Sequence, residues 1–419
     1  MRNSGYFKNK KVAIVGLARS GLACANLLFD LGADVSITDN QDNPAIGLKR
    51  AALKSEKIKI ELGRHSEDFI RGKDLVVVSP GVEALAPPLV WARKLNIPVI
   101  SEIEVGWILC PGTIIAVSGS SGKTTVTTLI ARVIAESCKK VFTCGNIGNP
   151  FCAEVAKMRE GDFVSLEVSS FQLEAIKNFK PHIAVILNIG RNHLDRYKNM
   201  RQYCDAKKRL FMNQSPSDYL ILNKSDPILN DFAKQASSQV RLFSGTNELN
   251  LNQAAVLAVA SILGIAQETC LKVFREFKGI EHRMEQAAVI NGIKFINDSK
   301  STTVESAIWA LDNIKAPVIL ICGGKDKGAD YSLILGPAKG KVKHLILIGQ
   351  ARQKIRQALA GALAAQDAAT LEEAVDKAFA LAKSGDCLLF SPMCSSFDMF
   401  ANYEERGRVF KEIVSGLSK

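Results

Sequence analysis

The sequence predicts an α/β protein of three domains. The first observation is length, because 419 residues are too many for one ordinary hydrophobic core. The second is an alternation of short apolar runs with helical patterns, which is typical of parallel sheets. The third is a glycine-rich loop between an apolar run and a helical pattern near residue 120. We expect domains over residues 1–100, 101–280 and 281–419.

The first segment predicts a Rossmann-like domain. An apolar run over residues 11–16 ends in glycine, a helical pattern covers 20–31, and a second apolar run over 35–38 ends at Asp39. An acidic residue ~20 positions after the first strand is typical of dinucleotide-type folds. A further strand is expected over 75–78. The turn between Gly16 and Gly21 reads GxxxxG rather than GxGxxG, so a redox dinucleotide is poorly supported. A nucleotide-diphosphate site and a plain turn both stay open.

The central segment predicts a P-loop-type ATPase domain. A strand over residues 113–117 leads into Gly119-Ser120-Ser121-Gly122-Lys123-Thr124-Thr125, and a helical pattern continues to about 136. Glycines let backbone amides surround phosphate oxygens, and the helix directs its positive N-terminal end at the anion. Lys123 would reach the β- and γ-phosphates, and Thr124 would hold Mg²⁺. The alternative is a Gly-Ser turn that happens to precede lysine.

Further strands complete the two remaining sheets. In the central segment we expect them over residues 163–168, 183–188 and 219–223. The third segment predicts another Rossmann-like domain, with strands over 293–297, 318–322, 344–348 and 387–391 and helices between them.

The composition excludes several classes of protein. Hydrophobic residues make up 47% and charged residues 23%, which is typical of folded domains. No apolar stretch reaches the ~18–20 residues of a membrane span, and residues 254–265 read as a buried helix. The basic, polar start lacks the apolar core of a signal peptide, so we expect a cytoplasmic protein without membrane insertion. The ten cysteines form no CxxC pair and are expected to be mostly buried, reduced thiols.

The net charge of +12 has two readings. A basic protein binds nucleic acid or smaller anions. Lysine and arginine are dispersed here, with no long basic run and no basic stripe interleaved with aromatic residues. We therefore expect anionic metabolites and no nucleic acid.

Several motifs resemble those of the Mur ligases, the family that builds the peptide of bacterial cell-wall precursors. The resemblance covers nearly the whole chain and keeps the family's order. It rests on the phosphate loop (118–125), LEVSSFQLE (166–174), NIGRNHLDRY (188–197), YCDAK (203–207) and EHR (281–283). The segments NDSKST (297–302) and SPMCSSFDMF (391–400) are most similar to those of members that add D-glutamate to UDP-N-acetylmuramoyl-L-alanine.

The resemblance implies an ATP-dependent ligase that works through an acyl phosphate, with two Mg²⁺ ions, in peptidoglycan synthesis. It implies catalytic roles for Lys123, Glu167, His193 and Lys207. The expected metal ligands are Thr124, Glu167, His193 and Lys207 as a carbamate. Oxygen donors are what a hard cation prefers. From the residues alone, Glu167 also fits a strand-end ion pair, His193 an ordinary loop histidine and Lys207 an exposed helix lysine beside Lys208 and Arg209.

The resemblance also assigns three ligand sites. The expected ATP-binding residues are Gly119, Ser120, Ser121, Gly122, Lys123, Thr124, Thr125, Asn223, Asp226, Asn250, His282, Arg283 and Asp298. The expected UDP-sugar-binding residues are Leu17, Ala18, Arg19, Ser20, Asp39, Asn40, Ser79, Asn146 and His193. The expected D-glutamate-binding residues are Lys300, Thr302, Lys327, Ser396 and Tyr403. The chain departs from the family at Leu249 and Gln253, near the adenine, and at Tyr403, where phenylalanine is common.

We expect a monomer, and two other classes of protein compete with this reading. A sister amide ligase, including the folylpolyglutamate type, would lack both the arrangement from Gly16 to Asp39 and the NDSK motif. A P-loop switch or nucleic-acid ATPase would bind DNA in a salt-sensitive way and release no phosphate in response to an amino acid.

Overall fold

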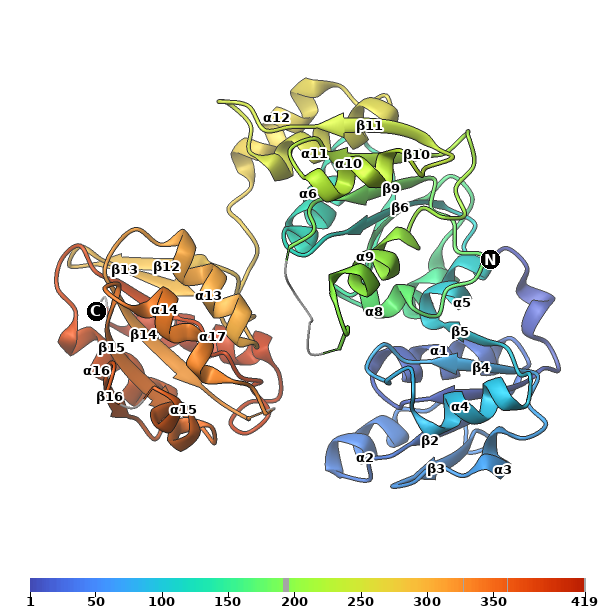
Figure 1. Ribbon diagram of the computed structural model, residues 1–419, viewed down its shortest axis with the longest axis horizontal. Coiled ribbons are helices and arrows are strands. Elements are labelled where there is room, and N and C mark those ends of the chain that lie inside the picture. The colour runs from blue at the N-terminus through green and yellow to red at the C-terminus, as the bar shows by residue number, and fades with distance from the viewer. Residues whose placement is uncertain (191–195, 327, 360, 418–419) are drawn as a thin grey trace. The chain divides into compact units, whose positions relative to one another are not determined.

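The computed structural model describes residues 1–190, 196–326, 328–359 and 361–417, and it separates into two compact units, Met1–Phe277 and Lys278–Lys419 (Figure 1). His193 and Lys327 lie outside the described residues. Each unit is described by itself below.

The first unit begins with a five-stranded parallel sheet in the order β3-β2-β1-β4-β5. Its strands are β1 Lys11–Val15, β2 Asp34–Asp39, β3 Lys59–Leu62, β4 Leu75–Val78 and β5 Val99–Ser101. Its helices are α1 Arg19–Asp30, α2 Pro44–Ala51, α3 Glu67–Ile70, α4 Pro87–Lys94 and α5 Glu102–Leu109. The carboxyl ends of β1, β2 and β4 bring Gly16, Asp39 and Ser79 to one edge, where ligands of such sheets bind.

A six-stranded parallel sheet follows in the same unit, in the order β11-β10-β9-β6-β8-β7. Its strands are β6 Thr113–Ser118, β7 Val141–Gly145, β8 Phe163–Glu167, β9 Ile183–Ile186, β10 Tyr219–Asn223 and β11 Gln239–Phe243. Its helices are α6 Lys123–Glu136, α7 Phe151–Glu154, α8 Ser170–Leu173, α9 Met200–Lys208, α10 Pro227–Ala233, α11 Leu251–Ile262 and α12 Gln267–Glu276. The predicted helix over 254–265 is α11, which begins three residues earlier.

One hydrophobic cluster joins these two sheets. It runs from Val12 and Leu28 of the first sheet region through Val105 of α5 and Phe151 of α7 to Leu166 of β8. A second cluster packs α6, α11 and α12 against the opposite face of the central sheet. The two sheet regions of this unit therefore share one hydrophobic core.

The second unit contains a six-stranded sheet in the order β12-β13-β17-β14-β15-β16. Its strands are β12 Glu285–Ile290, β13 Ile293–Asn297, β14 Val318–Gly323, β15 Val342–Ile348, β16 Ala364–Asp367 and β17 Cys387–Phe390. Its helices are α13 Val304–Asn313, α14 Leu335–Ala338, α15 Arg352–Ala358, α16 Leu371–Leu381 and α17 Tyr403–Gly416. Strand β12 pairs antiparallel with β13, unlike the parallel arrangement expected from the alternating pattern, because a two-residue turn at Asn291 and Gly292 joins them.

The cysteines and the apolar helices can also be compared with the sequence analysis. All ten cysteines are free thiols, and eight of them are buried, as the sequence predicts. Among the described residues, no helix has both the length and the apolar character needed to cross a membrane.

Candidate active site

The phosphate loop lies between the central strand β6 and helix α6, as predicted. Gly122 has a φ of +80°, and a Cβ there would lie 2.7 Å from the Asn252 side-chain oxygen, so glycine is required. The Asn188 Oδ1 atom accepts hydrogen bonds from the amides of Ser120 (3.1 Å) and Ser121 (2.9 Å). Lys123 Nζ donates to the Gly119 carbonyl at 2.9 Å. The Lys123 ammonium and the positive N-terminal end of α6 thus meet at the loop, a combination that binds phosphate, while Asn188 holds the amides of Ser120 and Ser121.

Asn188 and Asn252 were not among the predicted site residues. Asn188 follows β9, and Asn252 lies in the first turn of α11, so both reach the loop from distant parts of the sequence. Asn188 opens the NIGRNHLDRY segment, which was the available signal for it.

A carboxylate and an amide meet beside this loop. Glu167 ends β8, which pairs with β6 at Val117, and it is 2% exposed. Its Oε1 atom accepts a hydrogen bond of 2.7 Å from Asn146 Nδ2, at the end of the neighbouring β7. Its Oε2 atom is buried and has no hydrogen-bond partner among the described residues. A buried oxygen of this kind fits a hard cation, and Thr124 adds a hydroxyl in the first turn of α6.

Lys207 lies on the face of α9 that is turned toward the loop. It is 1% exposed, so the reading as an exposed helix lysine is wrong. Its Nζ atom donates to the Gly119 carbonyl at 2.9 Å and lies 4.8 Å from the centre of the Tyr203 ring. Burial, together with the nearby charge of Lys123, lowers the pKa of Lys207 well below its ordinary value. The neutral amine is therefore more accessible at Lys207 than at an exposed lysine.

The predicted UDP-sugar residues meet at the edge of the first sheet. Asp39 accepts hydrogen bonds from the amides of Leu17 (2.7 Å) and Gln41 (2.9 Å), and this pairing fixes the turn after β1. The Ser79 hydroxyl donates to the Gly16 carbonyl at 2.9 Å. The Arg19 guanidinium donates to the Gly148 carbonyl of the central domain. Of the remaining residues, Ala18 and Asn40 are exposed and Ser20 is half-buried.

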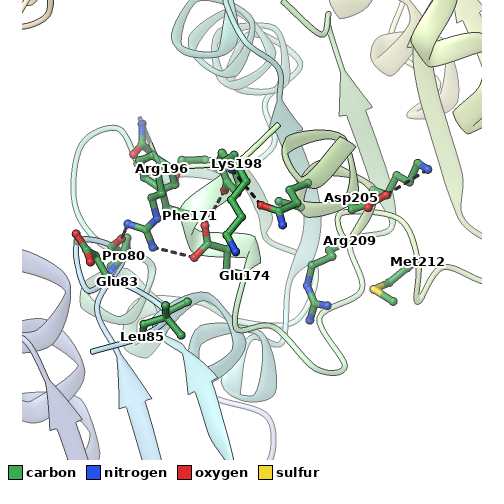
Figure 2. Close-up of a pocket in the computed structure, with 18 of the residues that line it drawn as sticks. Pro80, Glu83, Leu85, Phe171, Glu174, Arg196, Lys198, Asp205, Arg209 and Met212 are labelled. Carbon is green, nitrogen blue, oxygen red and sulfur yellow. Dashed lines mark hydrogen bonds and ion pairs between the residues drawn. The ribbon is translucent and has the colours of Figure 1, made fainter. Parts of the chain in front are cut away.

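A cavity of about 1350 Å³ adjoins this edge (Figure 2). One wall is the segment from Pro80 to Leu85 after β4, and the other is formed by α8, α9 and the loop before α9. Asn146 also lines the cavity and donates to Glu167, so one hydrogen bond links the cavity wall to the predicted metal-binding carboxylate.

Two predicted ATP residues of the first unit act as helix caps. Asp226 Oδ1 accepts from the amide of Ile228 at 3.0 Å, and its Oδ2 accepts from the amide of Ile189 at 2.8 Å. Asn250 exchanges two hydrogen bonds with Gln253 in a capping box at the start of α11. Asn223 is buried and accepts from the amide of Ser225.

The other predicted ATP residues lie in the second unit. His282 is buried, its Nδ1 atom lies 3.0 Å from Asn297 Nδ2, and burial lowers its pKa. Asp298 accepts from Ser391 Oγ at 2.8 Å, and burial raises its pKa to about 6. The Arg283 guanidinium lies 5.6 Å from the centre of the Trp309 ring.

In the second unit a buried arginine links the loops that carry several of the predicted D-glutamate residues, while Lys327 lies outside the described residues. Lys300 Nζ lies 5.8 Å from the centre of the Tyr403 ring. The Tyr403 carbonyl accepts from Ser299 Oγ at 2.8 Å. Arg406, 1% exposed, donates to the carbonyls of Ser299 (2.8 Å) and Cys394 (3.2 Å). It joins the loop of Lys300 and Thr302 to that of Ser396, and sequence reasoning missed it.

Three protein-family models match the chain along its length. They are the Mur ligase MurD-like N-terminal domain over residues 10–101, the Mur ligase middle domain over 117–284 and the Mur ligase glutamate ligase domain over 282–394.

Curated relatives match at full length. The UDP-N-acetylmuramoylalanine–D-glutamate ligase of Thermoanaerobacter pseudethanolicus is 38% identical, and the match covers 98% of this chain and 99% of that protein. The ligase of the same name from Geotalea uraniireducens is 40% identical, with 98% of each chain covered. Among solved structures, a UDP-N-acetylmuramate-alanine ligase from Thermotoga maritima shares the fold, with a TM-score of 0.60, 18% identity and coverage of 98% and 100%. The chain therefore belongs to the Mur ligase family.

Proposed function

We propose that this chain joins D-glutamate to UDP-N-acetylmuramoyl-L-alanine, with conversion of ATP to ADP and phosphate, in the synthesis of peptidoglycan precursors. The observation that carries the proposal is the similarity, over 98% of the chain, to ligases of that name. A cytoplasmic monomer is proposed with it.

The chemistry follows from the weakness of a carboxylate as an electrophile. A carboxylate oxygen of the UDP-sugar substrate attacks the γ-phosphorus of ATP, and ADP leaves. The amine of D-glutamate then attacks the acyl carbon of the resulting acyl phosphate, loses a proton, and phosphate leaves. Catalysis of the first step is mainly positioning and charge neutralisation.

The phosphate loop supplies both. The start of α6 directs its positive end at the phosphates, and the amides of Ser120 and Ser121, which donate to Asn188 Oδ1 in this structure, would turn to phosphate oxygens when ATP binds. The Lys123 ammonium, which donates to the Gly119 carbonyl in this structure, reaches the γ-phosphate and neutralises the charge that develops there.

Thr124, Glu167, His193 and Lys207 would hold two Mg²⁺ ions. When bound, Mg²⁺ neutralises phosphate charge and draws the acyl carboxylate and the γ-phosphate together. The buried Oε2 atom of Glu167, which has no hydrogen-bond partner among the described residues, supports this assignment. Burial of Lys207 supports its carbamylation, because only the neutral amine forms the N–C bond with carbon dioxide and releases a proton.

The two organic substrates have separate sites. The turn after β1, with Asp39 and Ser79, binds the UDP portion, and the adjoining cavity takes the sugar and its peptide as far as Asn146. In the second unit, Lys300, Thr302, Lys327 and Ser396 hold the two carboxylates of D-glutamate, since cations and hydroxyl donors suit a dicarboxylate. Tyr403 contributes from its backbone.

The test is phosphate release with ATP, Mg²⁺ and UDP-N-acetylmuramoyl-L-alanine, with each amino acid offered in turn. We expect release with D-glutamate and none with L-glutamate, L-lysine or diaminopimelate. Release with L-lysine or diaminopimelate but not D-glutamate would overturn the proposal. For the carbamate, Lys207→Ala should lose activity and recover part of it with an added short carboxylate, and undiminished activity would remove that role.

A further inference from the structure

Arg196 crosses from the central domain to the turn that follows β4 (Figure 2). Its Nη1 atom donates to the Pro80 carbonyl at 3.0 Å, and its Nη2 atom donates to the Val82 carbonyl at 3.0 Å. The side chain is 18% exposed, and its guanidinium carbon lies 4.2 Å from the centre of the Phe171 ring. One side chain thus connects the two sheets of the first unit at the cavity wall.

The two acceptors explain why arginine stands here. They are backbone carbonyls on either side of Gly81, so holding both needs two N–H groups in a fixed plane. A guanidinium has that fork and stacks on an aromatic ring, whereas a lysine ammonium is a single point charge. Lysine would keep the charge and lose the simultaneous grip on both carbonyls.

A carboxylate fixes the guanidinium from the central domain. Glu174 Oε2 accepts from Arg196 Nη2 at 2.8 Å, and its Oε1 accepts from the Tyr197 hydroxyl at 2.7 Å. Glu174 lies in the turn after α8, so the guanidinium is held from one domain and donates to the other. Because the pair is mostly buried, it is screened less than a surface ion pair.

The held turn supports the turn after β1. Ser79 Oγ donates to the Gly16 carbonyl, and a Cβ on Gly16 would lie 3.0 Å from the Ser79 Cβ and 3.2 Å from the Val82 Cγ2. The two turns are therefore in direct contact. Movement of the Ser79–Val82 segment would displace the backbone that is expected to bind the UDP portion.

We propose that Arg196 is a positioning residue for the UDP-sugar substrate, which holds the Ser79–Val82 turn and, through it, the Gly16 turn in the geometry that binds the nucleotide. This inference rests on the proposed function for its ligand. The role proposed for Arg196 does not extend to ATP binding, because Asn188, and not Arg196, holds the amides of the phosphate loop.

The test uses the full chain with Arg196→Ala, Arg196→Lys and Glu174→Gln, and Arg201→Ala as a matched control. Arg201 is an exposed arginine in α9, five residues away. Calorimetry measures the Kd of UDP-N-acetylmuramoyl-L-alanine and, separately, of ADP. Steady-state kinetics gives the KM of each substrate and kcat.

We expect Arg196→Ala to raise the Kd and KM for the UDP-sugar about 10- to 100-fold, since bonds to charged groups are each worth that order. Arg196→Lys should keep part of the affinity, and because it retains the charge and the long side chain it provides the same test should the alanine variant fail to fold. Glu174→Gln should have a smaller effect of the same kind. The Kd of ADP and kcat at saturation should change less than about twofold, and Arg201→Ala should leave every value unchanged.

Two results would overturn the inference. One is an unchanged UDP-sugar affinity in Arg196→Lys and Arg196→Ala, and the other is an equal loss of UDP-sugar and ADP affinity, which marks a general structural role. Failure of the unmodified chain to bind the UDP-sugar at all would instead refute the proposed function and, with it, the ligand named here.

Discussion

Glu102, the first residue of α5, is a carboxyl group whose protonation should control the stability of the first unit. It is 2% exposed, its Oε1 atom accepts from the Cys152 amide at 2.6 Å, and its Oε2 atom is buried without a hydrogen-bond partner among the described residues. Burial raises its pKa from 4.5 to about 7. Glu102→Gln keeps an acceptor for the amide and removes the charge.

The size of the effect follows from that pKa. The folded state binds the proton more tightly than the unfolded state, so the stability that it contributes is complete below about pH 4.5 and is lost as the pH rises through about 7. The difference between a pKa of 4.5 and one of about 7 corresponds to about 3 kcal/mol of unfolding free energy. Relative to the unmodified chain, Glu102→Gln should therefore gain up to about 3 kcal/mol above pH 7.5 and almost nothing at pH 4.5.

Urea unfolding between pH 4.5 and 8.5, followed by tryptophan fluorescence, measures this gain in stability. The control is Glu104→Gln in the same helix. Glu104 accepts hydrogen bonds from the amides of Lys177, Asn178 and Phe179 at 2.8–2.9 Å, so its charge is used and the change should destabilise at every pH. A raised pKa for Glu102 would be refuted by either of two results. One is a difference in unfolding free energy between Glu102→Gln and the unmodified chain that does not change with pH. The other is a Glu102→Gln variant that is less stable than the unmodified chain above pH 7.

Three further substitutions test the sites. Gly122→Ala requires alanine at a φ of +80° and pushes on Asn252, so it should cost about 1–3 kcal/mol of stability and weaken ADP binding measured by calorimetry. Asn146→Ala removes the hydrogen bond to Glu167 and should lower phosphate release about 10- to 100-fold, with a higher requirement for Mg²⁺. Arg406→Lys loses the fork that joins two loops of the second unit, and it should raise the KM of D-glutamate about tenfold without changing that of the UDP-sugar.

Each of these has a result that contradicts it. Unchanged ADP affinity in Gly122→Ala would mean that the loop tolerates a side chain. An unaltered magnesium dependence in Asn146→Ala would separate the amide from the metal site. An equal rise of both KM values in Arg406→Lys would indicate damage beyond the amino-acid pocket.

The strands that the sequence predicted all lie in the interior of their sheets. Every interior strand of the three sheets was predicted, and the six strands that were missed (β3, β5, β7, β11, β12 and β16) are the two edges of each sheet. Interior strands such as β14 are buried along their whole length and read as apolar runs. An edge strand such as β11 is exposed at three of its five positions and includes Gln239 and Arg241, and so short and polar a segment resembles a loop.

Residues at the site divide in a similar way. The phosphate loop was predictable because its requirements are local: a strand, two glycines, a lysine and a helix in sequence. Asn188 and Asn252 were not, since they reach the loop only after distant segments fold against it. For Asp226 and Asn250 the local sequence allowed two interpretations. Their residue types suit both ligand binding and helix capping, and the neighbouring Pro227 and Gln253 already carried the capping signal.

Lys207 shows why spacing alone leaves a role open. Three basic residues follow one another, and sequence gives no reason to separate them, yet successive positions on a helix point about 100° apart. In the structure Lys208 pairs with Asp205 at the partly exposed surface, Arg209 donates to the Leu173 carbonyl, and Lys207 alone of the three is fully buried. A buried lysine beside a second ammonium is costly in the charged form, so its retention needs a chemical reason. Burial therefore gives the carbamate proposal a physical basis that the sequence motif did not have.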